Sequence, residues 1–440
     1  MIRAFTFINP FYMDIQYIHS LFLKCKSVSI DTRKIGVNSF FVAIKGERFD
    51  ANTFASEALE KGASYVLIDN ASYYIDDRTV LVNDSLVALQ ELAQFHRDYL
   101  KLPIIALTGS NGKTTTKELI HVVLSKKFNT KATVGNYNNH IGVPLTLLSF
   151  TSETEIGIVE MGANHKKEIE FLCELAKPDY GYITNFGKAH LEGFGGVAGV
   201  IEGKSEMYQY LAKNDKLVFI NLEDPIQVEK SKLLKSFSFG LNKENADVCI
   251  AKVKANPFVV IAYSDITIQS HLIGLYNANN LNAALAIGKY FEVDNISIKQ
   301  ALEGYIPENN RSQLLIKESN EIILDAYNAN PSSMAVAITN FLQLEKPNKI
   351  MILGDMFELG NESPKEHKEL IDSLLDENSI QCFFIGSAFY DNRIDKSNFY
   401  FYDSFDAFSN YLKKIQIRNS IILIKGSRGM ALERTLDFLL

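Results

Sequence analysis

IIALTGSNGKTTTKE, residues 104–118, joins an apolar strand pattern, a glycine turn, a lysine and a run of threonines to a helix start. A strand, a glycine turn and a helix in this order are typical of a phosphate-binding loop. The strict pattern G-x-x-x-x-G-K-[ST] requires a glycine five positions before Gly112, where this chain has Leu107. Leu107 falls inside the expected strand, so we predict a shorter loop, G-x-x-G-K-T.

The residue types in the loop suit the binding of phosphate. Gly109 and Gly112 allow a tight turn and a close approach of backbone amides to phosphate oxygens. The helix that starts after Lys113 adds a partial positive charge at the same point. Lys113 is expected to bridge the β- and γ-phosphates, and the Thr114 hydroxyl to bind Mg²⁺. The alternative is an ordinary glycine turn before a surface helix.

Length and composition limit the class of protein. With 440 residues, 47% of them hydrophobic, the chain is too long for one core and should form two or three domains. A net charge of -7 and the lack of a Lys/Arg-rich run argue against a nucleic-acid partner. The start MIRAFTFINPFYMDIQYIHS has no leader pattern, and no long uncharged apolar run occurs, so we expect a cytoplasmic protein without a membrane span. The cysteines are far apart, which favours free thiols in a reducing compartment; they are Cys25, Cys173, Cys249 and Cys382.

Strand and helix patterns alternate along most of the chain, which predicts an α/β protein with parallel sheets covered by helices. We predict a small α/β N-terminal domain (1–100), a central parallel-sheet domain that carries the phosphate loop (101–310) and a C-terminal Rossmann-like domain (311–440). SQLLIKE and EIILDAY, separated by SN, should open the third domain as a hairpin. ALERTLDFLL should close it as a helix.

Two polar residues lie where expected strands end. Glu160 follows a mostly apolar strand, IGIV, and an acid there is costly unless it is paired or bound to a metal. A structural ion pair is the alternative. His190 lies in TNFGKAHLEGFGG, the loop after a third parallel strand, where a ligand role and a structural role are both open.

Lys204 occupies an unusual place on an expected helix. At 100° per residue it falls in the middle of an apolar stripe, which is formed by Val197, Val200, Ile201, Tyr208 and Leu211. A buried lysine is costly unless it pairs, loses its proton or is modified. A neutral amine can add CO2 to give an anionic carbamate that binds metal. Periodicity alone favours the alternative, a packed stem whose ammonium reaches a carboxylate.

Seven sequence blocks follow one another in a characteristic order: TGSNGKTTTKE, NNHIGVP, VEMGA, TNFGKAHLEGFG, EGKSE, LYNANNLNAALA and KGSRGMALE. In these blocks the chain resembles the Mur ligase family, the ATP-dependent amide ligases of peptidoglycan precursor synthesis. The likeness covers nearly the whole chain. Three more stretches, DTRKIGVNSFFVAIKGERFD, LDAYNANPSSM and LGDMFELG, are similar to the branch of this family that uses D-alanyl-D-alanine.

The resemblance implies a reaction. ATP would transfer its γ-phosphoryl group to the terminal carboxylate of UDP-MurNAc-tripeptide, and the amine of D-alanyl-D-alanine would attack the resulting acyl phosphate. Such chemistry depends on charge neutralisation and positioning more than on covalent catalysis. The cofactors implied are ATP and Mg²⁺, and we expect a monomer. Whether the third residue of the tripeptide is diaminopimelate or lysine stays open.

The resemblance also assigns roles by matching position. The phosphates of ATP would contact Gly109, Ser110, Asn111, Gly112, Lys113, Thr114 and Thr115. Thr114 and Glu160 would hold one Mg²⁺, and His190 with carbamylated Lys204 a second. The residues with a catalytic role would be Lys113, Glu160, His190 and Lys204.

Further binding residues are implied in all three predicted domains. Asn277 and Asn280 would face adenine, with an amide-capped helix start as the alternative. Arg311 and Asp325 would contact phosphate and ribose. The uridine nucleotide would meet Asp31, Thr32, Arg33 and Lys45, for which a solvated loop is the alternative. The dipeptide or ATP would meet Asn328, Asn330, Ser427 and Arg428.

Two other functions remain compatible with the core motifs. A sister Mur ligase or a folylpolyglutamate-type ligase would share the chemistry but not the substrate. A nucleotide-dependent switch without ligase activity would need no second metal site, so Glu160, His190 and Lys204 argue against it.

Overall fold

The computed structural model describes residues 14–308 and 310–439. The prediction that no leader is present rests mainly on residues 1–13, which lie outside the described residues. The chain divides into two compact units. The first contains the chain up to Ala106, Phe128–Gly162 and Glu170–Tyr180; the second contains Leu107–Lys127, Ala163–Ile169 and Gly181–Leu440.

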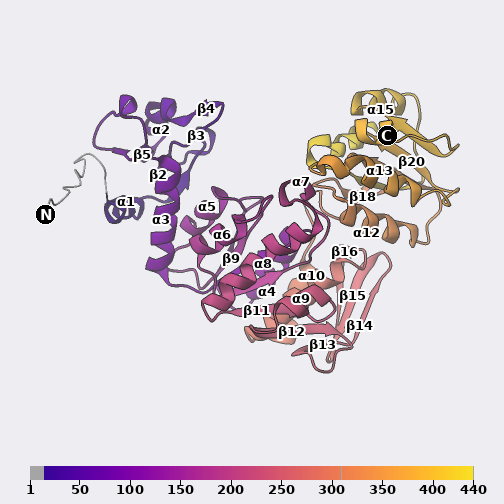
Figure 1. Ribbon diagram of the computed structural model, residues 1–440, viewed down its shortest axis with the longest axis horizontal. Helices are drawn as coiled ribbons and strands as arrows, with labels where there is room; N and C mark the ends of the chain where they lie inside the picture. Colours follow the sequence, from indigo (N-terminus) through magenta and orange to yellow (C-terminus); the bar gives the residue numbers. More distant parts are fainter. Residues whose placement is uncertain (1–13, 309, 440) are drawn as a thin grey trace. The chain divides into compact units, whose positions relative to one another are not determined.

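The N-terminal part of the first unit, coloured indigo to violet in Figure 1, has a parallel four-stranded sheet. The order of its strands is β1-β2-β5-β6. Phe41, Val66 and Ile68 point into its core together with alanines of the helical segments. The elements are α1 (Ile15–Phe22), β1 (Ser27–Ser29), η1 (Thr32–Lys34), β2 (Ser39–Val42), β3 (Lys45–Gly46), β4 (Phe49–Asp50), η2 (Ala51–Phe54), α2 (Ala55–Glu60), β5 (Ala63–Ile68), η3 (Ala71–Tyr73), β6 (Thr79–Leu81) and α3 (Ser85–Leu100).

Two buried histidines connect α1 to α3. The Nε2 atom of His19 lies 3.0 Å from Nδ1 of His96, whose Nε2 lies 3.0 Å from the backbone oxygen of Phe150. Burial, aided by the charge of His96, lowers the pKa of His19 to about 4. Burial also lowers the pKa of His96. Both imidazoles are therefore held neutral in the folded protein.

We expect acid to weaken this junction. The unfolded chain binds more protons than the folded chain between the ordinary histidine pKa of about 6.5 and the lowered folded values. The contribution of His19 to the free energy of unfolding is fully present above that pH, and it is lost as the pH falls through the folded pKa of about 4. Melting of wild type and His19→Phe at about pH 7 and about pH 5 tests this. The fall in Tm should be smaller in the variant, and an equal fall would contradict the prediction.

The central region contains a seven-stranded sheet in the order β13-β12-β11-β10-β7-β9-β8. Its pairs β8–β9, β11–β12 and β12–β13 are parallel, as predicted. The elements are β7 (Ile104–Thr108), α4 (Lys113–Leu124), β8 (Thr130–Ala132), α5 (Gly142–Leu148), β9 (Ile156–Glu160), α6 (Glu168–Ala176), β10 (Tyr180–Ile183), α7 (Leu191–Phe194), α8 (Val197–Lys213), β11 (Leu217–Asn221), α9 (Pro225–Lys230), β12 (Lys235–Leu241) and β13 (Val248–Ile250).

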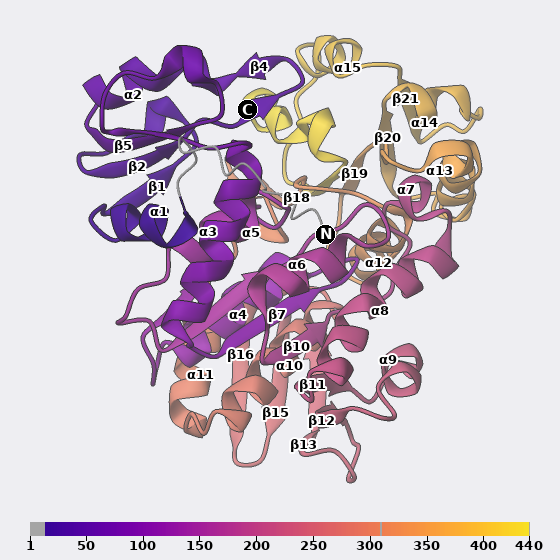
Figure 2. The same cartoon turned by 60° about the vertical axis from the view of Figure 1, so that its left-hand side comes forward.

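A second sheet, which the sequence analysis did not predict, follows β13. β14, β15 and β16 are antiparallel neighbours, and α11 lies beside β16 (Figure 2). The alternating burial of β16 shows that one face is covered and the other is open to solvent. The elements are β14 (Lys252–Ala255), β15 (Phe258–Tyr263), β16 (Ile266–Ile273), α10 (Asn277–Tyr290) and α11 (Asn295–Gly304).

The C-terminal region has a six-stranded sheet in the order β17-β18-β22-β19-β20-β21. The predicted hairpin is confirmed as the antiparallel pair β17–β18, and the other pairs are parallel. The elements are β17 (Gln313–Lys317), β18 (Asn320–Asp325), α12 (Pro331–Leu342), β19 (Lys349–Gly354), η4 (Gly360–Glu362), α13 (Ser363–Asp372), β20 (Gln381–Ile385), α14 (Ser387–Asp391), β21 (Phe399–Tyr402), α15 (Phe405–Leu412), β22 (Ile421–Lys425), η5 (Arg428–Met430) and η6 (Leu432–Phe438).

The last segment is a helix of the 3₁₀ type. ALERTLDFLL was expected to form a helix, and Leu432–Phe438 does so as a 3₁₀ helix. Leu432 and Thr435, three positions apart, are fully buried. That spacing matches a helix with three residues per turn better than one with 3.6.

All four cysteines are free thiols, as predicted. No helix among residues 14–308 and 310–439 has the length and apolarity needed to span a membrane.

Candidate functional site

The phosphate loop connects β7 to α4 and has the shorter form that was predicted. Leu107 is fully buried inside β7, so it belongs to the strand and not to the turn. Gly109 has φ 144° and Gly112 has φ 79°, conformations that side chains rarely adopt. A Cβ on Gly109 would lie 1.9 Å from Oγ1 of Thr184. The loop therefore needs glycine for its backbone conformation and for space.

Gly109→Ala is expected to lower the free energy of unfolding by about 1–3 kcal/mol and to impair nucleotide binding. The added methyl group would also lie 2.9 Å from the backbone nitrogen of Thr184, which cannot rotate away. Denaturant unfolding and ADP titration measure both effects. Gly304→Ala is the matched control, because a Cβ there meets no atom within 4 Å. If both variants unfold at the same denaturant concentration, the steric argument is wrong.

Hydrogen bonds hold the loop against the segment that follows β10. Ser110 donates from Oγ to the backbone oxygen of Gly187 (2.7 Å), and Thr184 donates from Oγ1 to that of Asn111 (2.6 Å). The backbone N–H of Asn111 donates to Oδ1 of Asn185 (3.1 Å). Lys113 donates from Nζ to the backbone oxygen of Gly109 (2.8 Å). The loop is thus preformed, with its lysine folded back over it.

Asn277 and Asn280 connect the phosphate-loop helix to α10. Asn280 accepts from Oγ1 of Thr116 (3.0 Å) and donates to Oδ1 of Asn277 (2.8 Å), which itself donates to the backbone oxygen of Ile273 (2.7 Å). The alternative of an amide-capped helix start is wrong, because the N-cap residue is Tyr276 and it makes no side-chain cap. Contact with adenine stays a prediction.

Glu160 ends β9 as a nearly completely buried carboxylate, 1% exposed. Its Oε1 accepts from Nδ2 of Asn138 (2.8 Å). Its Oε2 has no hydrogen-bond partner among the described residues. The structural ion pair that was the alternative is not found in the described part of the chain. A buried carboxylate oxygen without a partner is costly, and a cation would compensate it.

Lys204 is fully buried in α8, and its Nζ has no hydrogen-bond partner in the described part of the chain. Nζ lies 5.3 Å from the centre of the Phe194 ring. Burial, aided by the charge of Lys113, holds the pKa of the amine well below its usual value against the opposing effect of Glu168 and Glu206. The alternative of an ammonium that reaches a carboxylate is therefore wrong. The apolar stripe is narrower than predicted, since Val197 is 42% exposed.

His190 precedes α7 in a left-handed conformation, with φ 53°. Its Nδ1 lies 2.6 Å from Oε2 of Glu358. The imidazole holds the pKa of Glu358 below its usual value through this contact. Nδ1 therefore faces a carboxylate at close range, although the two atoms lack the geometry of a hydrogen bond. Nε2, for which no hydrogen bond is found among the described residues, is the ring nitrogen that we expect to face a ligand.

The candidate residues fit magnesium in part. Among the described residues, no group of three or more His, Cys, Asp or Glu side chains is placed to hold a metal ion. The unpartnered Oε2 of Glu160 nevertheless is the hard anionic oxygen that Mg²⁺ prefers. The Lys204 amine is not such a ligand, but its carbamate would supply two oxygens.

The C-terminal candidates lie at the ends of parallel strands. Asp325 ends β18 and forms an ion pair with buried Lys425 (2.6 Å). Asn330 caps α12 and donates to Oδ1 of Asn111 in the phosphate loop (2.7 Å). Ser427 is buried and accepts from the backbone N–H of Phe357 (2.9 Å). Asn328 is exposed, and Arg428 pairs with Glu433 (2.7 Å).

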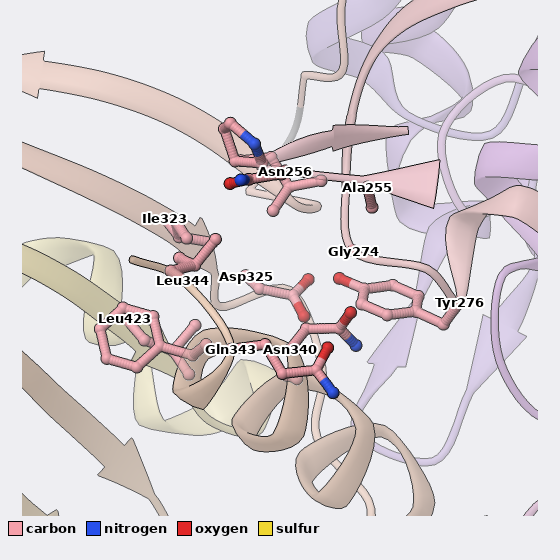
Figure 3. Close-up of a pocket in the computed structure, with 14 residues that line it drawn as sticks. Ala255, Asn256, Gly274, Tyr276, Ile323, Asp325, Asn340, Gln343, Leu344 and Leu423 are labelled. Atoms are coloured by element: carbon pink, nitrogen blue, oxygen red, sulfur yellow. The ribbon is translucent and has the colours of Figure 1, made fainter. Parts of the chain in front are cut away.

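A pocket lies beside Asp325, with an empty volume of about 490 Å³ that includes solvent at its mouth. Tyr276 and Asp325 point toward one another across it (Figure 3). Burial and the charge of Asp325 raise the pKa of Tyr276. Most other walls are apolar, formed by residues such as Ile273, Ile323, Phe341, Leu344 and Leu423.

The N-terminal candidates form a small local cluster in the first unit. Asp31 caps η1 by accepting from the backbone N–H of Arg33 and pairs with its guanidinium (2.8 Å). The guanidinium hydrogen bonds lower the pKa of Asp31 to about 2. The Arg33 side chain is 86% exposed, and Lys45 is exposed in β3. Thr32, the first residue of η1, is half-buried. Binding of a nucleotide by these residues stays a prediction.

Three domain families match the chain in succession. They are the Mur ligase family, catalytic domain, at residues 24–97, the Mur ligase middle domain at 107–288, and the Mur ligase, glutamate ligase domain at 310–428. A curated relative from Bacillus subtilis, UDP-N-acetylmuramoyl-tripeptide–D-alanyl-D-alanine ligase, is 35% identical over 418 residues, 92% of this chain and 91% of the relative. The chain belongs to the Mur ligase family.

Solved Mur ligase structures share the fold over nearly the whole length. MurF from Acinetobacter baumannii has a TM-score of 0.82 and 29% identity, and it covers 96% of this chain and 97% of its own. MurF from Thermotoga maritima, solved in complex with ADP, has a TM-score of 0.81 and 26% identity, with 95% and 97% covered. The predicted fold class, three α/β domains with a parallel-sheet centre, is confirmed.

Sequence reasoning missed several residues of this Mur ligase that contact the candidates. Asn138 bonds to Glu160, Glu358 contacts His190, and Lys425 pairs with Asp325. Each of these three residues lies in or beside one of the sequence blocks that carry the family resemblance. A sequence block, however, does not show which side chains are in contact in the folded protein. Lys425 could have been found in the same way as Lys204, because it is a lysine at the end of an apolar strand, where burial of a charge is costly.

Proposed function

We propose that this Mur ligase joins D-alanyl-D-alanine to UDP-MurNAc-tripeptide in a reaction driven by ATP hydrolysis to ADP and phosphate. The product is UDP-MurNAc-pentapeptide. The observation that carries the proposal is the Bacillus subtilis relative of that name, 35% identical over 92% of this chain. Buried Lys204 and Glu160 support it, because a simple nucleotide switch has no use for two costly buried groups of this kind.

ATP is the proposed phosphoryl donor. The Thermotoga maritima relative binds ADP, and the loop from Gly109 to Thr115 has the glycine conformations and the helix start that phosphate needs. Lys113 would leave the backbone oxygen of Gly109 and turn to the phosphates. Asn277, Asn280, Arg311 and Asp325 are proposed to hold the base, ribose and a phosphate.

We propose that Thr114 and Glu160 hold one Mg²⁺, and that His190 and carbamylated Lys204 hold a second. When bound, these ions would supply positive charge to the phosphoryl group. The protein's own contribution is to bury Oε2 of Glu160 without a partner among the described residues, to place His190 against Glu358, and to favour the neutral form of the Lys204 amine by burying it.

The reaction then needs positioning at two points. A carboxylate oxygen of the tripeptide attacks the γ-phosphorus in line, the bond to ADP breaks, and an acyl phosphate results. The dipeptide amine attacks the acyl carbon, loses a proton and displaces phosphate. Loop amides and Lys113 would neutralise charge in the first step. Asn328, Asn330, Ser427 and Arg428 are proposed to orient the dipeptide or ATP.

The uridine nucleotide is proposed to bind near Asp31, Thr32, Arg33 and Lys45. Exposed Arg33 and Lys45 would offer positive charge to a diphosphate. Domain boundaries at about residues 100 and 310, a monomeric state and a cytoplasmic location stay predictions of the sequence.

The test is product formation with purified protein. We expect UDP-MurNAc-pentapeptide by mass when ATP, Mg²⁺, D-alanyl-D-alanine and UDP-MurNAc-tripeptide are present, and none when any one is omitted. Tripeptides ending in diaminopimelate and in lysine are compared in parallel. Single amino acids and a folate–glutamate pair serve as competing acceptors and substrates. If the protein turns over a single amino acid or the folate–glutamate pair, and does not turn over D-alanyl-D-alanine, the chain belongs to another branch of amide ligases.

A further inference from the structure

Arg311 is a half-buried cation that has no counter-ion among the described residues. No hydrogen bond or ion pair of Arg311 is found among residues 14–308 and 310–439, and its Nε is buried without a partner there. Its guanidinium carbon lies 3.5 Å from the centre of the Tyr327 ring. An arginine has five N–H donors, so an arrangement that uses none of them on protein groups is poised for an anionic ligand.

The backbone around Arg311 is bent to produce this stack. Asn310 and Ser312, on either side of it, have φ 56° and 48°, left-handed conformations that cost about 1 kcal/mol or more each for residues other than glycine. Ser312 donates its N–H to Oδ1 of Asp325 (3.2 Å), and Tyr327 donates its N–H to the backbone oxygen of Asn310 (3.2 Å). These bonds lock the Arg311 segment beside the Tyr327 strand end.

A second guanidinium lies near the same ring but is already neutralised. Arg428 is 6.0 Å from the centre of the Tyr327 ring, and Nη1 lies 2.7 Å from Oε1 of Glu433. Of the two cations, Arg311 is therefore the one left to bind an anion. The planar ring of Tyr327 lies against the face of the Arg311 guanidinium and fixes its plane.

We infer that Tyr327 is a positioning residue for nucleotide binding: its ring holds the Arg311 guanidinium in the plane from which its N–H groups reach a phosphate of ATP. The inference rests on the proposed function and adds to it a residue with no assigned role. The ring lowers the number of rotamers open to a long side chain before the ligand arrives, so less entropy is lost on binding. The Tyr327 hydroxyl has no part in this.

The experiment compares binding of ADP with binding of adenosine, which lacks phosphate, by calorimetry on the full-length protein. Tyr327→Leu should weaken ADP binding about tenfold, between the values for an exposed and a desolvated cation–π contact, and leave adenosine binding unchanged. Tyr327→Phe, which keeps the ring, should bind both as wild type does. Arg311→Lys should weaken ADP at least as much as Tyr327→Leu, because an ammonium has no plane to stack. The double variant should be no weaker than Arg311→Lys.

Tyr390→Leu is the matched control, since Tyr390 also lies under an arginine, Arg393, at 4.5 Å, outside the candidate site. It should leave ADP binding unchanged. The inference is overturned if Tyr327→Leu binds ADP normally, if it loses adenosine equally, or if Tyr327→Phe is as weak as Tyr327→Leu. A wild type that binds ADP but forms no pentapeptide would count against the proposed function alone.

Discussion

Lys204→Ala is expected to reduce ligase turnover about a thousandfold, the largest effect of any single substitution at the candidate site. The amine is fully buried and has no partner among the described residues, and its pKa is held well below the usual value by burial. Burial favours the neutral form of such an amine, which is the form that adds CO2, forming an N–C bond and releasing one proton. The carbamate supplies a metal-binding anion that alanine cannot.

Turnover should return in part when acetate or another short carboxylic acid is added to Lys204→Ala, because the acid replaces the missing carboxylate in the space left by the side chain. A ¹³C signal of the carbamate should appear in wild type under labelled CO2 and be absent in the variant. Lys213→Ala, at the exposed end of the same helix, is the control and should retain full activity. Unchanged turnover in Lys204→Ala would rule the carbamate out.

Glu160→Gln is expected to reduce turnover at least about a hundredfold and to raise the Mg²⁺ concentration needed for half-maximal activity. Glutamine has the same shape and can still accept from Asn138, so the change removes charge without creating a cavity. The buried Oε2 is the oxygen without a partner in the described residues, and an amide there is a poor ligand for Mg²⁺. A titration of turnover against Mg²⁺ measures both effects.

Glu155→Gln is the control for this prediction. Glu155 lies just before the other end of β9, is exposed, and accepts from the backbone N–H of Asn129. It should show the wild-type Mg²⁺ dependence. If Glu160→Gln lowers Tm strongly but leaves the Mg²⁺ requirement unchanged, Glu160 is a structural residue and not a metal ligand.

The phosphate loop is a feature of the fold that local sequence predicts well. Its position, its shortened form and its two special glycines were all predicted, because a strand, a turn and a helix start are set by neighbouring residues. The hairpin β17–β18 was predicted for the same reason. The antiparallel sheet β14–β16 was missed, because most of its residues are only partly buried and the apolar alternation is weak.

The environment of the Lys204 side chain is a feature that local sequence does not predict. Periodicity placed it on the buried side of a helix, but it could not tell a lysine that reaches a carboxylate from one that has none. The structure resolves this, since Glu206 lies on the same helix but its Oε1 accepts from the backbone N–H of Lys167 instead. Likewise, the sequence shows Tyr327 only as one residue of the motif DAYNANP. Its stack with Arg311 depends on two segments that meet at the end of a strand in the folded protein.

By itself, then, the sequence determined the α/β class, the order of the elements and the phosphate loop, because these depend on patterns within short stretches of the chain. It also determined the membership of a ligase family, because the family's sequence blocks occur here in the same order. Only the tertiary structure decided which buried or half-buried charged side chains lack partners in the described part of the chain, as Lys204 and Arg311 do, and which are paired, as Asp325 is with Lys425. The reason is physical: the energy of a buried charge depends on the groups within a few ångströms, and folding brings those groups from distant parts of the chain.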